Sequence, residues 1–369
     1  MQKLLNFFRL SAYSFIFAFL MLVIILVYKK NIPYELLIQE AIPFYQANFD
    51  AHVLFIQPET KKVFKKQSVN INRKINKPKR NIITDMITEQ NIKFMPREEN
   101  HDLYKNILAI TASKNLDPIN YLKSNFYNTD KKTELTLADF DIQRLLSTNV
   151  RLENKNLNKP QVLIFHTHST EMFKDSNPKN IYDGVVGLGK RLSELLNQKY
   201  NINTIHHTKR YDIINNKPDK RGAYERMEPE IKKILEQNPS IEVAIDIHRD
   251  GVSDSVHLVE NINNKPTAKI MFVNGICKLL KNNMLIPIKN LPNPYLDTNL
   301  ALSLKMQIIA NKLYPKLNRK IYINAYRYSL NMLPKSLLIE VGAQTNTKQE
   351  ALNAIDLLAE ILANVLLER

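Results

Sequence analysis

The stretch Val162-Leu-Ile-Phe-His-Thr-His-Ser-Thr-Glu171 decides the fold and the chemistry that we expect of this chain. Its first four residues are apolar, which is typical of a short strand buried inside a parallel sheet. Side chains that can bind a metal follow at once. Because ligands bind beyond the carboxyl ends of the strands in open α/β sheets, the stretch predicts a site at the end of a buried strand.

Apolar runs alternate with amphipathic stretches throughout residues 159–369, the predicted catalytic domain. We expect further strands at 203–207, 243–248, 269–273, 321–325 and 336–341, and helices at 186–200, 225–237, 296–314 and 347–367. Strands that alternate with helices favour an α/β fold with a mostly parallel sheet and helices on both faces.

The His166-Thr-His168 triplet suggests a metal site. Side chains alternate along a strand with a period of two, so we expect this triplet at the end of a strand to place both imidazoles on the same side. Glu171 follows His168 by three residues and can chelate the same ion from a tight turn. Three His or carboxylate ligands with one position open to water are typical of catalytic Zn²⁺.

A second group is Asp246-Ile-His-Arg-Asp250, which follows another apolar run. His248 supplies a further imidazole, and Asp246 is spaced to fix its tautomer through a hydrogen bond. Arg249 has two interpretations: it contacts an anionic group of the substrate, or it neutralises Asp250.

Glu340 interrupts the apolar strand Leu337-Leu-Ile-Glu-Val-Gly342. A buried carboxylate is costly unless it is paired or coordinated, so a functional position is expected. Beside an activated water, Glu340 would act as general base and then as proton donor, and burial would raise its pKa toward neutrality. The alternative is an edge-strand glutamate that points to water.

The other histidines have no carboxylate constellation around them in the sequence. We therefore expect structural roles for His52, His101, His206, His207 and His257.

Leu10 to Tyr28 is uncharged and rich in Phe, Leu, Ile and Val, after a short tail at 1–9. These 19 residues would span about 28 Å as a helix, close to the thickness of a bilayer's hydrocarbon core. No small-x-small cleavage site follows, which favours an uncleaved transmembrane helix over a signal peptide. Lysines on both sides leave its orientation undecided.

Residues 31–94 are expected to form a basic, flexible linker. Between Lys61 and Arg80 the chain has nine Lys or Arg and no acidic residue, a composition that cannot bury a core. Attraction to anionic lipids or wall polymers is the alternative role. Residues 95–158 carry helix-compatible patches at 104–112 and 135–146, and form either a small accessory region or a part that packs on the main domain.

Composition narrows the function classes. The formal net charge of +16 would suit nucleic acid, but much of it lies in the basic linker, so we do not expect nucleic-acid binding. The single cysteine, Cys277, excludes an intrachain disulfide and a Cys-rich metal site.

Four segments of the chain resemble the stage II sporulation protein P family, and the similarity covers roughly residues 160–369. They are Val162-Leu-Ile-Phe-His-Thr-His-Ser-Thr-Glu171, Gly184-Val-Val-Gly-Leu-Gly-Lys190, Ile245-Asp-Ile-His-Arg-Asp-Gly251 and Leu337-Leu-Ile-Glu-Val-Gly-Ala-Gln-Thr-Asn346. The resemblance implies a membrane-anchored, zinc-dependent N-acetylmuramoyl-L-alanine amidase, with endopeptidase activity also attributed to the family. It implies an extracytoplasmic catalytic domain that acts on peptidoglycan and whose fold resembles the zinc amidases of cell-wall turnover. In spore formers it implies cooperation with the stage II sporulation proteins D and M during engulfment.

The resemblance also implies roles for single residues. His168 matches the first zinc ligand, His248 the later histidine and Glu340 the catalytic glutamate. Glu171 is our choice for the carboxylate ligand, although the amidases place theirs farther downstream, so His166 and Glu171 stay interchangeable as candidates. His166 or Arg249 would add a second contact to the oxyanion.

Two other functions remain open. An H-x-H triplet also begins metallo-β-lactamase and amidohydrolase sites, although this chain lacks a convincing full set of their later ligands. A non-catalytic scaffold that binds the cell wall would need no zinc.

Overall fold

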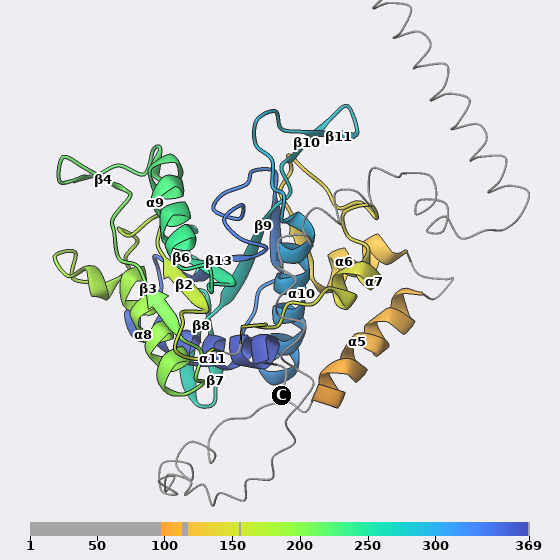
Figure 1. Cartoon of the computed structure of the whole chain (residues 1–369), viewed down its shortest axis with the longest axis horizontal. Helices are drawn as coiled ribbons and strands as arrows, with labels where there is room; N and C mark the ends of the chain where they lie inside the picture. Colours follow the sequence, from red (N-terminus) through yellow and green to blue (C-terminus); the bar gives the residue numbers. More distant parts are fainter. Residues whose placement is uncertain (1–96, 113–116, 155, 368–369) are drawn as a thin grey trace, which may run out of the picture. The chain divides into compact units, whose positions relative to one another are not determined.

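The computed structural model describes residues 97–112, 117–154 and 156–367 (Figure 1). The predicted tail at 1–9, the transmembrane helix at 10–28 and the linker at 31–94 lie outside these residues. Within the three described ranges, no helix combines the length and the apolar character that a membrane span requires.

The centre of the fold is a seven-stranded sheet with the order β1-β12-β9-β13-β6-β2-β3. Neighbouring strands are parallel except at β13 and β9, so the sheet is mixed and mostly parallel. The bounds of the strands are β1 Tyr127–Thr129, β2 Val162–Phe165, β3 Thr204–His206, β6 Val243–Asp250, β9 Ile270–Gly275, β12 Ile321–Asn324 and β13 Lys335–Ala343. The predicted α/β class is confirmed, and the sequence did not predict the reversal at β9.

Helices cover both faces of this sheet. On one face the largest apolar core joins the strands to α8 (Val185–Gln198), α10 (Leu296–Leu313) and α11 (Lys348–Leu367). On the other face α9 (Ala223–Gln237) packs over β2 and β6 through Met227 and Ile231. Each of these helices begins and ends within a few residues of its predicted bounds, because apolar residues at helical spacing mark the face that packs on the sheet.

The residues before 159 pack on the same domain. They form α5 (Arg97–Thr111), α6 (Pro118–Asn125) and α7 (Ile142–Ser147), and β1 extends the sheet by pairing with β12. Phe140 and Leu145 are fully buried in the main core. Of the two arrangements left open for this region, packing on the main domain is the one observed.

Three short hairpins project from this framework: β4 (Ile213–Ile214) with β5 (Lys217–Pro218), β7 (Val259–Ile262) with β8 (Lys265–Ala268), and β10 (Lys278–Lys281) with β11 (Met284–Pro287). Each turns through two asparagines with positive φ, at 215–216, 263–264 and 282–283. Asparagine tolerates this left-handed conformation better than most residues, and two such residues in succession make a tight hairpin turn. Figure 1 shows β10 and β11 standing out from the body. The short 3-10 helix η2 (Ile181–Asp183) leads into α8.

The end of β13 is irregular, and this irregularity lies next to Glu340. The pairing between β13 and β6 shifts between Glu340 and Ala343. Gly342 has φ of 62°, and a Cβ there would lie 2.8 Å from Asn346 Oδ1. Glycine adopts this backbone without steric cost and leaves room for Asn346, so Gly342 allows the bulge directly after the candidate base.

Candidate metal centre

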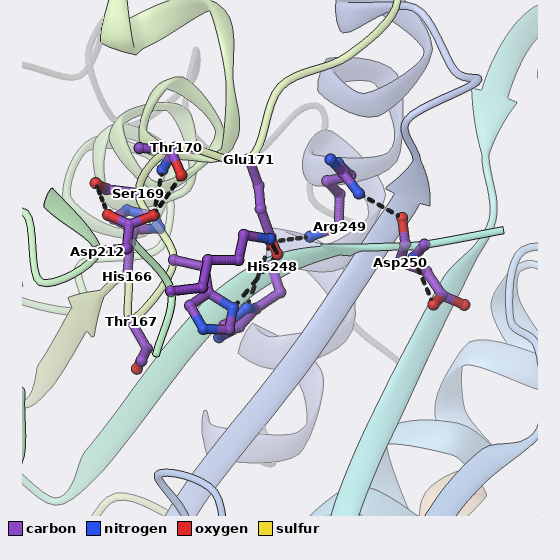
Figure 2. Close-up of polar contacts among 12 residues, drawn as sticks. His166, Thr167, Ser169, Thr170, Glu171, Asp212, His248, Arg249 and Asp250 are labelled. Atoms are coloured by element: carbon purple, nitrogen blue, oxygen red, sulfur yellow. Dashed lines mark hydrogen bonds and ion pairs between the residues drawn. The ribbon is translucent and has the colours of Figure 1, made fainter. Parts of the chain in front are cut away.

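Three candidate ligands converge at one end of the sheet. Ligand atoms of His168, Glu171 and His248 all lie within 4.8 Å of one another. His168 Nδ1 is 3.4 Å from Glu171 Oε1, and His248 Nδ1 is 3.4 Å from Glu171 Oε2. In Figure 2 the side chain of Glu171 points toward His248.

A tight turn after β2 brings Glu171 back to this point. Its backbone N–H donates to His168 O over 3.3 Å, and its carbonyl accepts from Val185 at the start of α8. The carboxylate also accepts from the Arg249 backbone N–H at 3.0 Å and from Lys220 Nζ at 2.7 Å. Burial acts to raise the pKa of Glu171, but hydrogen bonds from His168 and His248 outweigh it and hold this pKa well below its ordinary value. Glu171 is therefore ionised, as a metal ligand must be.

His248 is oriented by Asp246, as the period-two spacing predicted. Both residues lie on the same face of β6, and His248 Nε2 is 2.9 Å from Asp246 Oδ1. Asp246 is fully buried and also accepts hydrogen bonds from the Thr167 backbone N–H and hydroxyl at 2.9 and 2.6 Å. Asp246 thus ties the loop that carries His168 to the strand that carries His248. Because the Asp246 carboxylate lies at Nε2 of His248, the other ring nitrogen, Nδ1, remains available to bind a metal.

Glu340 lies next to this cluster on β13. It is the register partner of His248 on one side and of Met271 on the other, so its side chain is on the same face of the sheet as His248. Its Oε2 is buried without a hydrogen-bond partner in the described part of the chain. Burial raises the pKa of Glu340 to about 7, and the carboxylate of Glu171 adds to the shift while the charge of His248 opposes it.

One pocket of about 430 Å³ contains all four groups. Its lining combines apolar residues of the sheet with tyrosines and cationic side chains. Its lining also includes Lys220, Tyr224, Arg249, Asp250, Gly251, Met271, Val273, Arg319, Tyr322, Tyr328 and Leu338.

His166 does not reach this pocket, contrary to the geometry expected of the triplet. β2 ends at Phe165, so the alternation of a strand does not extend to His168. The fully buried His166 ring instead lies 3.1 Å from Ile247 O through Nδ1 and 2.9 Å from His206 Nε2 through Nε2. His166 therefore does not lie where it could replace Glu171 as a metal ligand. Nor does it lie where it could contact an oxyanion in the pocket.

Arg249 lines the pocket, but it does not neutralise the Asp250 carboxylate. Its guanidinium donates to the backbone carbonyls of Met172 and Asp250 at 3.0 and 3.1 Å. The Asp250 carboxylate is paired with Arg319 Nη1 at 2.5 Å instead. Figure 2 shows Arg249 and Asp250 together beside the central cluster.

The other predicted structural histidines make ordinary contacts. His207 lies 2.8 Å from the Tyr211 hydroxyl, and His257 pairs with Glu350 at 2.8 Å. His101 is exposed on α5, and His52 lies outside the described residues.

Several pocket residues were missed from the sequence. Lys220 precedes α9 and Tyr224 lies in its first turn, while Arg319 and Tyr328 come from the segments around β12. The Tyr224 ring packs edge-on against His168, with ring centroids 5.5 Å apart. Burial and the nearby carboxylates of Asp246 and Glu340 raise its pKa well above the ordinary value. No sequence pattern marks these positions, because they meet the cluster only through the sheet order.

The residues present fit a zinc ion. Two imidazoles and one carboxylate form the donor set, and the pocket leaves the remaining side open. Glu340, whose Oε2 has no partner among the described residues, lines the same pocket as the three candidate ligands. The same set would accept other divalent transition metals, because imidazole and carboxylate ligands also suit several of these ions.

Comparisons with known proteins agree on the family. The family model of stage II sporulation protein P matches residues 36–363. The stage II sporulation protein P of Bacillus subtilis (strain 168) is 23% identical over 257 residues, which cover 64% of this chain. The chain spans 59% of the length of that curated relative.

Solved structures give a more distant likeness. The N-acetylmuramoyl-L-alanine amidase AmiC2 of Nostoc punctiforme is 14% identical with a TM-score of 0.31, and covers 56% of this chain and 95% of its own. An N-acetylmuramoyl-L-alanine amidase from Clostridium difficile 630 is 16% identical with a TM-score of 0.33, over the same shares of the two chains. The match of the family model, which extends over most of the sequence, carries the assignment: the chain belongs to the stage II sporulation protein P family.

Proposed function

We propose that this protein is a zinc-dependent peptidoglycan hydrolase that cleaves the amide between N-acetylmuramic acid and the L-alanine of the stem peptide. The observation that carries the proposal is the convergence of His168, Glu171 and His248 beside Glu340 in one pocket. Membership of the stage II sporulation protein P family supports a role in cell-wall remodelling during sporulation.

In this proposal His168, Glu171 and His248 hold the metal. When bound, zinc polarises the scissile carbonyl and lowers the pKa of water, which prepares both reactants at neutral pH. The low pKa of Glu171 keeps it ionised, and Asp246 keeps Nδ1 of His248 free to coordinate.

Glu340 moves the proton. A pKa of about 7 places its carboxylate close to the working pH, where it can both accept and return a proton. It takes the proton from water as the C–O bond forms, and delivers it to the amide nitrogen as the C–N bond breaks. The products are a free lactyl carboxyl group on the sugar and a free amino group on L-alanine.

The cellular setting is part of the proposal. We infer from Leu10 to Tyr28 a single-pass membrane anchor with the C-terminal domain outside the cytoplasm, where peptidoglycan lies. Engulfment, with the stage II sporulation proteins D and M as partners, is the process that the family suggests.

The test is the chemistry of the new ends. Purified protein loaded with zinc is incubated with peptidoglycan, and the products are identified by mass spectrometry before and after chelation. We expect lactyl ends and new L-alanine amino termini that disappear with chelator and return with added zinc. Products cut within the peptide would identify an endopeptidase, and binding without cleavage or zinc would identify a scaffold.

A further inference from the structure

Four of the polar side chains that line the pocket already bind other groups of the protein. Lys220 donates to Glu171, Arg249 donates to two backbone carbonyls, and Arg319 is paired with Asp250. Tyr322 donates its hydroxyl to Asp130 Oδ2 at 2.7 Å. Each of these four groups therefore already has a partner within the protein.

Two phenols are the exception. Among the residues that the structure describes, neither the Tyr224 nor the Tyr328 hydroxyl has a hydrogen-bond partner. Both residues are only partly buried and line the pocket, so their hydroxyls are available to a ligand that enters it.

Tyr224 is the phenol that adjoins the candidate ligands. Its ring packs edge-on against His168 on one side and lies 5.8 Å from the Tyr328 ring on the other. These two contacts restrict the orientation of the ring, and with it the position of the hydroxyl.

The backbone of Tyr328 supports this arrangement. Its φ is 54°, a left-handed conformation that is uncommon for a bulky side chain. Strained backbone of this kind gathers at functional sites, where the surrounding structure maintains it. Here it holds an aromatic ring against Tyr224.

We propose that Tyr224 is a catalytic residue whose phenol O–H donates a hydrogen bond to the carbonyl oxygen of the amide that is cleaved. This inference rests on the proposed function and adds a residue to it. The donor keeps its proton throughout, and its hydrogen bond strengthens as negative charge develops on the oxygen. It takes the place of the oxyanion contact that the sequence assigned to His166 or Arg249.

The experiment replaces Tyr224 with phenylalanine, which removes the hydroxyl and retains the ring contacts. On a soluble muramoyl peptide we expect kcat to fall about 10²-fold, the typical effect of losing one such donor. Zinc affinity and melting temperature should stay at wild-type values. The matched control is Tyr211→Phe, which removes a hydroxyl that contacts His207 outside the pocket and should retain full activity.

A binding measurement separates catalysis from positioning. In a Glu340→Gln background, calorimetry of the same peptide should give equal affinity with and without the Tyr224→Phe change, because the hydrogen bond matters most in the transition state. Wild-type kcat in Tyr224→Phe, or a loss of zinc affinity that accounts for its lower rate, would overturn the inference. Absence of lactyl ends from the wild-type protein would instead remove the proposed function, and this inference with it.

Discussion

Glu340 and His248 are register partners across the parallel strands β13 and β6. Partners in a parallel pair direct their side chains to the same face of the sheet, so the strand register alone brings the candidate base next to a candidate ligand. Leu338 and Asp246 are partners one step earlier on the same face. The intervening Ile339 and Ile247 point into the main apolar core. Alternate residues of β6 and β13 therefore face opposite sides of the sheet, one side lining the pocket and the other packing in the core.

Replacing Glu340 with glutamine should retain zinc and lose turnover. The amide keeps the size of the side chain but cannot accept a proton, so we expect activity to fall about 10²- to 10⁴-fold. Metal analysis measures the retained zinc, and the rate of release of L-alanine amino termini measures the loss of turnover. Glu194→Gln, a half-buried position on α8 outside the pocket, is the control and should remain active. Unchanged turnover in Glu340→Gln would remove this residue from the mechanism.

Replacing Asp246 with asparagine should weaken metal binding. The change removes the charge that orients His248 and weakens the tie to Thr167, and loss of such a partner typically costs 10- to 100-fold in affinity. Competition with a chromophoric zinc chelator measures the effect. Asp139→Asn, which alters another buried carboxylate whose partner Lys278 lies outside the pocket, should leave zinc affinity unchanged. Equal affinity in Asp246→Asn would mean that His248 needs no orienting partner.

The sequence predicted the parts of this site that depend on one strand. Asp246 and His248 share a strand, so their period of two was a sound guide. The same rule failed for His166 and His168 because β2 ends at Phe165, as predicted, and the alternation of a strand does not apply to residues beyond its end.

The other residues that line the pocket come together only through the topology of the fold. Tyr224 and Tyr328 are 104 positions apart in the numbering, and only the sheet order and the packing of α9 bring their rings to 5.8 Å. The antiparallel pairing of β9 with β13 could not be predicted for a related reason. The buried residues of β9 give the same apolar run in either strand direction. Local patterns thus predicted the elements, and the contacts between distant elements had to be observed.

Gly189 tests how α8 is placed against the site. A Cβ at this position would lie 2.5 Å from His166 Nε2 and 2.6 Å from His206 Nε2, closer than packed atoms approach. Gly189→Ala should therefore push α8 from the sheet and cost about 1–3 kcal/mol of unfolding free energy, as overpacking does. Urea denaturation measures the loss. Gly251→Ala, where a Cβ meets nothing within 4 Å, is the control, and equal stability of the two variants would contradict the observed packing.

The pair of His166 and His206 should make the fold sensitive to acid. Burial lowers the pKa of His206 to about 3, and the charges of His166 and His207 act in the same direction. In the unfolded chain the pKa is about 6.5, so below that pH the unfolded state takes up a proton that the folded state does not. Stability is therefore fully present above pH 6.5 and falls as the pH drops toward 3. For this group the loss between pH 7.5 and 5 is on the order of 1–2 kcal/mol.

His206→Gln removes this titration while keeping an N–H group that can face His166 Nε2. We expect its unfolding free energy to fall less between pH 7.5 and 5 than that of the wild-type protein. Urea titrations in the presence of chelator make the comparison, because chelation removes the separate pH dependence of metal binding. His101→Gln, at an exposed position on α5, should keep the full acid dependence. If His206→Gln lost as much stability on acidification as the wild-type protein, the acid sensitivity would have to come from other buried groups.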